Sequence, residues 1–237
     1  MEEDSVNGSN GENATQRCDI DADFEQLRAI MEDPSFRSGS SLAGEQAFYI
    51  YDYPPECELE VRENIPLLAK QLQTMKPKRP GDYAPTVLRL DLYDLVIGIL
   101  EKRNLLQRIL TFEQDHHDPV SGNKVEDKFL ALLENMVGAD SKYLPDAVGA
   151  RFREALGAGK ADIVFLTGVG QTYPYVRAHT LLETLQGKVE DKPLVLFYPG
   201  RFTTTSAAGS TMSLYGCLPA SNYYRARSLR DMMAGRR

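Results

Sequence analysis

The sequence predicts an α/β fold with a mostly parallel sheet of four to five strands, covered by helices, and a helical insertion between strands two and three. Short segments rich in β-branched and aromatic residues alternate with segments of helical period. Residues 163–166 and 194–197 are continuously apolar, as is typical of central parallel strands that are buried on both faces. Residues 92–156 have helical period almost throughout, which indicates a helical lobe at one edge of the sheet.

The first third of the domain reads as helix, strand, helix and strand. Residues 23–31 have helical spacing, and Asp33-Pro34 ends that helix. Residues 47–51 form the first strand, which the turn-forming residues 52–55 stop. The next helix has Asn64 as a candidate cap and an apolar face formed by Val61, Ile65, Leu68 and Leu72. Residues 86–91 form the second strand.

The insertion at about 92–156 divides into helical segments at positions where the period breaks. The segments are 92–100, 105–112, 125–137 and 144–156. Asn104, the loop-like stretch 118–122 and Gly138 separate them.

A βαβ unit follows the insertion. Strand 162–167 runs into a glycine turn, and a helix is expected from Pro174 with a core face of Ala178, Leu181, Leu182 and Leu185. The next strand, 194–198, stops at Pro199-Gly200, and residues 223–226 form a short fifth strand. The chain therefore divides into a flexible polar tail at 1–18, a single α/β domain at 19–228 and a basic tail at 229–237.

Composition excludes several classes of protein. The amino terminus has no signal-peptide pattern, and no run approaches the roughly 20 apolar residues that cross a membrane, so a cytoplasmic protein is expected. Cys18, Cys57 and Cys217 are odd in number and widely spaced, which argues against a disulfide framework or a zinc site. We expect no cofactor.

The charge distribution leaves one route to nucleic acid. A net charge of −7 repels a phosphate backbone unless a local basic patch overcomes it. Such a patch lies at the carboxyl terminus, in Arg225, Arg227, Arg230, Arg236 and Arg237. It is either a solvated, frayed tail or a docking strip for a protein or nucleic acid.

The turn after the third predicted strand has some features of a phosphate site. Ligands of such sheets bind at the carboxyl ends of the strands. Gly168, Gly170 and Thr172 are candidates for an anion or nucleotide contact through backbone amides, yet no lysine follows them and Lys160 lies at the opposite end of the strand. The alternative is a purely structural turn.

Three other groups of residues have side chains suited to catalysis or metal binding, but none matches a known catalytic motif. Tyr175 and His179 lie one helical turn apart and could share a surface, as a packed polar contact or as a catalytic pair. Residues 115–118, Asp-His-His-Asp, have metal-binding side chains in loop composition. Asp52, Asp91 and Asp94 could hold magnesium, but helix capping also explains Asp91. We therefore expect a protein that is not an enzyme.

Several motifs together resemble the BrxB family, small core proteins of BREX bacteriophage-exclusion systems. The resemblance covers about residues 20–228, and its motifs are Phe48 to Asp52, Leu90 to Tyr93, the turn from Leu166 to Gly170 with Tyr173 to Arg177 and His179, the turn from Phe197 to Gly200 with Leu214, Gly216 and Leu218, and Tyr223 to Ala226. It implies a defence component that works beside a PglZ-like protein, a PglX-like methyltransferase and a BrxC-like ATPase. It implies no catalytic residue.

We expect a non-enzymatic adaptor that binds other BREX components, and the PglZ-like protein is the foremost expected partner. Interfaces favour tyrosine and arginine, so the candidate interaction residues are Tyr173, Tyr175, Arg177, His179, Arg201, Phe202, Tyr215, Arg225 and Arg227. Core packing is the alternative role of the aromatic ones. The alternative functions are a degenerate nucleotide or phosphate sensor at residues 168–172 and direct DNA contact through the terminal arginines.

Overall fold

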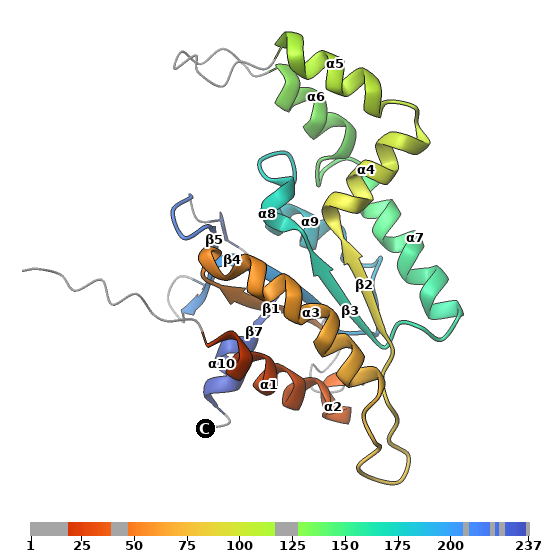
Figure 1. Ribbon diagram of the computed structural model, residues 1–237, viewed down its shortest axis with the longest axis vertical. Coiled ribbons are helices and arrows are strands. Elements are labelled where there is room, and N and C mark those ends of the chain that lie inside the picture. The colour runs from red at the N-terminus through yellow and green to blue at the C-terminus, as the bar shows by residue number, and fades with distance from the viewer. Residues whose placement is uncertain are drawn as a thin grey trace, which may run out of the picture.

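The computed structural model describes residues 19–38, 47–116, 128–205, 209–218, 221–222 and 226–235 (Figure 1). The strands are β1 (Phe48–Tyr53), β2 (Val87–Asp91), β3 (Ile163–Thr167), β4 (Leu194–Thr205), β5 (Gly209–Leu214), β6 (Ser221–Asn222) and β7 (Arg227–Ser228). Parallel pairing gives the order β2-β3-β4-β1-β7, and β5 and β6 continue from β4 in antiparallel pairing. The predicted α/β fold with a mostly parallel sheet is confirmed.

Helices cover both faces of this sheet. One face carries α1 (Ile20–Met31), α2 (Pro34–Arg37), α3 (Glu58–Gln73) and α10 (Leu229–Ala234), with a short 3₁₀ turn, η2 (Pro55–Cys57), before α3. The other carries α4 (Leu92–Lys102), α7 (Tyr143–Gly157), α8 (Val169–Thr172) and α9 (Ala178–Thr184). None of the described helices is long and apolar enough to cross a membrane.

Strand β3 shows why the central strands are apolar throughout. Ile163 and Phe165 pack under α1 and α3, whereas Val164 and Leu166 pack under the helices of the opposite face. All four side chains are buried, because successive residues of a strand point to opposite faces. Burial on both faces is therefore the physical cause of the unbroken apolar run.

The helical insertion lies between β2 and β3, as predicted. It comprises α4, α5 (Leu106–His116), α6 (Lys128–Val137) and α7, and Figure 1 shows α5 and α6 extending away from the sheet. Asn104 has a positive φ of 55° where α4 gives way to α5. The predicted break at 118–122 lies outside the described residues.

Two predicted helix starts are wrong. Helix α3 begins at Glu58 behind an acidic first turn, so Asn64 is not a cap but lies inside the helix and donates to the Glu60 carbonyl (3.1 Å). Helix α9 begins at Ala178 and not at Pro174. Tyr173 is extended (φ −71°, ψ 142°), because a proline disfavours the helical conformation in the residue before it.

Strand β4 runs through the expected stop at Pro199-Gly200. Pro199 still pairs with Tyr53 of β1, and Gly200 pairs with Leu214 of β5, so the strand changes from parallel to antiparallel partners at this dipeptide. A Cβ on Gly200 would lie 2.3 Å from the Ser213 carbonyl oxygen. Glycine is needed there for the close approach of two backbones and does not end the strand.

The carboxyl-terminal segment also differs from expectation. Residues 229–234 form α10, which Ser228 caps, and Leu229 and Met233 are buried, so this part of the expected basic tail belongs to the core. Cys57 is disulfide-bonded, which the cysteine spacing did not predict, and Cys217 is a free, exposed thiol. The short strand expected at 223–226 falls almost wholly outside the described residues.

Candidate functional site

The carboxyl ends of β1, β2, β3 and β4 meet at one edge of the sheet, where ligands of parallel sheets bind. The connections that leave this edge are η2 and α3 after β1, α4 after β2 and α8 after β3. The hairpin of β4 and β5 continues past the same edge. Most of the candidate residues from the sequence lie on these connections.

Asp91 occupies the space beside the glycine turn. Its Oδ1 accepts hydrogen bonds from the amides of Tyr93 (3.0 Å) and Asp94 (3.2 Å), which caps α4 as predicted, and its Oδ2 accepts one from the Thr167 hydroxyl (2.8 Å). Gly168 has a φ of 83°, and a Cβ there would lie 2.9 Å from Asp91 Oδ1. A phosphate at this turn would meet a carboxylate, so the geometry favours the structural explanation of Gly168.

The other two candidate anion contacts serve the fold as well. A Cβ on Gly170 would lie 2.7 Å from the Tyr215 hydroxyl, which donates to the Gly170 carbonyl at 2.7 Å. Thr172 is buried, and its hydroxyl donates to the carbonyls of Gly168 and Val169, each at 3.2 Å. The turn is thus closed by its own contacts.

Tyr173 and Tyr215 form an exposed aromatic pair, here called the tyrosine ridge. Their rings are 6.4 Å apart at 82°, an edge-to-face arrangement, and the two residues are 36% and 38% exposed. Burial, and then the charges of Glu58 and Tyr173, raise the pKa of Tyr215. Tyr215 therefore stays a neutral hydrogen-bond donor near neutral pH.

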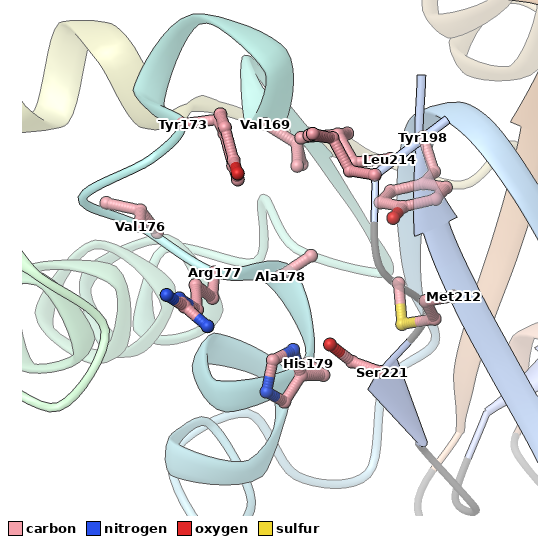
Figure 2. Close-up of a pocket in the computed structure, with 11 residues that line it drawn as sticks. Val169, Tyr173, Val176, Arg177, Ala178, His179, Tyr198, Met212, Leu214 and Ser221 are labelled. Atoms are coloured by element: carbon pink, nitrogen blue, oxygen red, sulfur yellow. The ribbon is translucent and has the colours of Figure 1, made fainter. Parts of the chain in front are cut away.

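A cavity of about 170 Å³ lies on one side of this ridge, between the segment α8–α9 and the hairpin β4–β5; we call it the α9 pocket (Figure 2). Six of its eleven lining residues are aliphatic or methionine, and Arg177, His179 and Ser221 are the polar side chains besides two tyrosines. The apolar part consists of Val169, Val176, Ala178, Met212, Leu214 and Leu218, with the rings of Tyr173 and Tyr198.

Charge in the α9 pocket comes from Arg177. Burial lowers the pKa of His179, and Arg177 lowers it further, while Glu183 and Asp140 partly oppose these effects. The imidazole is therefore neutral near neutral pH, and the exposed guanidinium of Arg177 is the cation at the mouth. The predicted neighbour Tyr175 packs against the core, where burial raises its pKa to about 12.

A second, more open hollow of about 360 Å³ lies on the other side of the ridge. It is lined by Pro55, Glu58, Arg62, Gly170, Gln171, Pro199 and Tyr215. Tyr173 lines the α9 pocket and Tyr215 lines this hollow, so the tyrosine ridge separates two depressions of one surface.

The remaining candidate interaction residues divide by exposure. Arg201 and Arg227 are exposed, whereas Phe202 is buried and its amide donates to Asp52 Oδ2 (3.0 Å). Phe202 is therefore part of the core and not a surface anchor. Arg225 lies outside the described residues.

Sequence reasoning missed a partly buried polar cluster at the end of β1. Arg230 from α10 donates to the Asp52 carbonyl (2.6 Å) and pairs with Asp23 (2.9 Å), which also accepts from the Tyr51 hydroxyl (2.8 Å). Burial raises the pKa of Asp52. Arg230 thus holds α10 to the sheet, and one arginine of the expected basic strip is used inside the fold.

The metal candidates are not brought together. Asp52 and Asp91 lie near the carboxyl ends of β1 and β2, and β3 and β4 lie between these strands, so their backbones are about 14 Å apart at the usual strand spacing. Within the described ranges, no group of three or more histidine, cysteine, aspartate or glutamate side chains could hold a metal ion. The side chains of residues 115–118 fall outside the description.

Comparison with known proteins adds a family to this geometry. A family model described as "BREX protein BrxB" matches residues 88–229, which include the tyrosine ridge and the α9 pocket. The chain is 33% identical over 212 residues to a BREX protein BrxB of Bacillus cereus, across 90% of this chain and 98% of that protein. It is 29% identical over 201 residues to a BREX protein BrxB of Escherichia coli, across 85% and 86% respectively. No solved structure matches it significantly.

Proposed function

The chain belongs to the BrxB family of BREX phage-defence components, and from this premise we propose that it is a non-enzymatic adaptor that binds other BREX proteins in the cytoplasm. The foremost partner in this proposal is the PglZ-like protein, with the PglX-like methyltransferase and the BrxC-like ATPase as further members of the assembly. The observation that carries the proposal is the tyrosine ridge between two depressions.

Other exposed apolar side chains lie on connections that leave the same edge of the sheet. Leu59 follows β1 and is 74% exposed, and Tyr93 follows β2 and is 41% exposed. With Tyr173 and Tyr215, they place large apolar groups on connections that leave one edge of the sheet. Clustered exposed apolar groups mark interaction surfaces, whereas singly scattered ones are ordinary.

The ridge is also held in place before any partner binds. The Tyr215 hydroxyl is fixed by its hydrogen bond to the Gly170 carbonyl, and its ring is fixed by the edge-to-face contact with Tyr173. Ordering a side chain at an interface costs free energy, so a ring that is already ordered binds more tightly. Tyrosine is also enriched among the residues that dominate binding energy.

The proposal is tested by co-elution of the purified chain with each purified BREX protein, followed by affinity measurements on variants. We expect Tyr173→Ala and Tyr215→Ala to weaken binding by at least about tenfold, as interface anchors do. Tyr83→Ala is the matched control, because Tyr83 is 47% exposed but precedes β2 at the opposite edge of the sheet.

Two results would contradict the proposal. One is a native chain that binds no BREX protein at micromolar concentration. The other is equal affinity of the two ridge variants and the Tyr83 control for the partner, which would mean that the interface lies elsewhere on the surface.

The geometry favours neither alternative function. The Asp91 carboxylate lies beside the turn that a nucleotide phosphate would need, and Arg230, one of the five arginines proposed for DNA contact, is paired with Asp23. The adaptor is therefore the function that the described surface supports best.

A further inference from the structure

The size of the α9 pocket restricts what it can hold. Its volume is about 170 Å³. Sites for small molecules and cofactors usually measure about 300–1,000 Å³. A cavity of about 150 Å³ is enough for benzene. The pocket therefore fits one aromatic ring, and a nucleotide would extend well beyond it.

The lining of the pocket suits such a ring. Val169, Val176 and Met212 are almost fully buried and come from three different segments of the chain. Methionine sulfur makes favourable contacts with aromatic rings. Figure 2 shows the Met212 side chain and the Tyr198 ring on the hairpin side of the cavity, opposite Val176 and Ala178.

The mouth of the pocket adds one positive charge to this apolar interior. Arg177 is exposed, and within the described part of the chain it forms no ion pair. The chain as a whole carries a net charge of −7, so a strongly acidic partner would be repelled over most of the surface. A single carboxylate at the guanidinium avoids that repulsion and can be held by two hydrogen bonds.

From this combination we propose that the α9 pocket receives one aromatic side chain of a partner protein, and that Arg177 pairs with an acidic residue next to it in the partner chain. The inference rests on the proposed adaptor function, which it deepens by naming the chemistry of the bound segment. Arg177 immediately precedes Ala178, which lines the cavity, so charge and cavity are close enough for neighbouring residues of an extended segment, at about 3.3 Å per residue.

The pocket can be tested on the isolated full-length chain with a defined probe, the peptide N-acetyl-Asp-Phe-Asp-amide. We expect it to shift the NMR signals of the Met212 and Val176 methyl groups at millimolar concentration. The matched peptides N-acetyl-Lys-Phe-Lys-amide and N-acetyl-Asp-Ala-Asp-amide should bind at least about tenfold more weakly, which corresponds to about 1.4 kcal/mol of binding free energy. Equal shifts with all three peptides, or shifts only outside the pocket, would overturn the inference.

Two variants separate the ring from the charge. Ser221→Phe places a ring in the cavity and should abolish probe binding, and Arg177→Glu should weaken binding of the acidic probe but strengthen binding of the lysine peptide. Arg108→Glu on α5 is the matched control for the charge change, because Arg108 is exposed and distant from the pocket lining. An Arg177→Glu variant that keeps the native preference would overturn the charge assignment.

The same variants in the co-elution assay separate this inference from the adaptor proposal. If the native chain, Ser221→Phe and Arg177→Glu all bind a BREX protein equally well, the pocket inference is refuted and the adaptor proposal stands. If the native chain binds the probe but no BREX protein, the adaptor proposal is refuted and the pocket remains a binding site for an aromatic side chain. Concentration-dependent dimerisation that the probe abolishes would identify a second copy as the occupant and overturn the assignment to a partner protein.

Discussion

Replacing Gly168 with alanine tests the structural role of the glycine turn. The left-handed φ of 83° costs a residue with a Cβ about 1–2 kcal/mol. The new Cβ would also lie 2.9 Å from Asp91 Oδ1. Displacing that carboxylate removes the cap of α4, which is worth about 1 kcal/mol. We therefore expect Gly168→Ala to lower the free energy of unfolding by about 2–3 kcal/mol.

Gly81 provides a matched control for this measurement. It has the same φ of 83°, but a Cβ there would meet no atom within 4 Å. Gly81→Ala should therefore cost only the conformational part, about 1–2 kcal/mol. Urea unfolding with linear extrapolation measures both values, and their difference reports the contact with Asp91.

Equal losses in the two variants would refute the contact between Gly168 and Asp91. A second comparison uses Asp91→Asn, which keeps the shape of the side chain but removes its charge. If the turn were an anion site that Asp91 blocks, Asp91→Asn would gain affinity for inorganic phosphate. We expect no such gain, because Thr172 and Gly170 are engaged in contacts within the fold.

Three further predictions follow from burial, charge and close approach. Leu229→Ala should lower the free energy of unfolding in urea by about 2–5 kcal/mol, as is usual for a buried leucine, whereas Leu59→Ala should change it by no more than about 0.5 kcal/mol. Equal effects would mean that residue 229 lies in a frayed tail. The pKa of His179 is lowered in the fold, so the stability that its neutral form contributes is present above the unfolded pKa of about 6.5 and is lost as the pH falls through that value toward the folded pKa. In unfolding curves measured at several pH values, His179→Gln should reduce this loss of stability. An unchanged dependence of stability on pH would contradict the prediction. Gly170→Ala places a Cβ 2.7 Å from the Tyr215 hydroxyl. It should lower the free energy of unfolding by about 1 kcal/mol for the lost hydrogen bond, and it should weaken partner binding as Tyr215→Ala does. Intact partner binding would mean that this hydrogen bond does not support the interface.

The sequence predicts the layers of the fold because local pattern and burial agree there. Helix α3 is an example, since Val61, Ile65, Leu68 and Leu72 were expected on one face and all four are buried. The same agreement holds for β3, whose apolar run reflects two covered faces. Periodicity is a local property, so a single sequence reports it directly.

Element ends depend on partners that periodicity does not show. Pro199 and Gly200 are ordinary turn residues by composition, yet β4 continues through them because pairing with β1 extends to Pro199 and pairing with β5 begins at Gly200. Leu229 and Met233 were hidden among arginines, and their burial depends on packing against β1 and α1. Both outcomes are decided by contacts between distant parts of the chain.

The sequence indicates which edge of the sheet to search for a site, but it does not predict how the residues there are arranged. The rule for parallel sheets points to Tyr173 at the carboxyl edge, whereas Tyr215 was a candidate only because interfaces favour tyrosine. Nothing local predicts that the two rings meet, or that Arg177 and Met212 line one cavity. The α9 pocket exists because β4 extends beyond its parallel neighbours and turns back as β5, which leaves an apolar face that α8 and α9 only partly cover.

The glycine turn illustrates the same physics. A glycine in a sequence reports that something approaches its backbone closely, or that its φ is positive, but it does not report what approaches. At Gly168 the neighbour is the carboxylate of Asp91, and at Gly170 it is the hydroxyl of Tyr215. Either glycine could equally have faced a phosphate, and only the long-range contacts distinguish these cases. Because the turn fixes Tyr215 from one side and supplies Val169 to the pocket on the other, its conformation serves binding through the shape of the surface and not through its own amides.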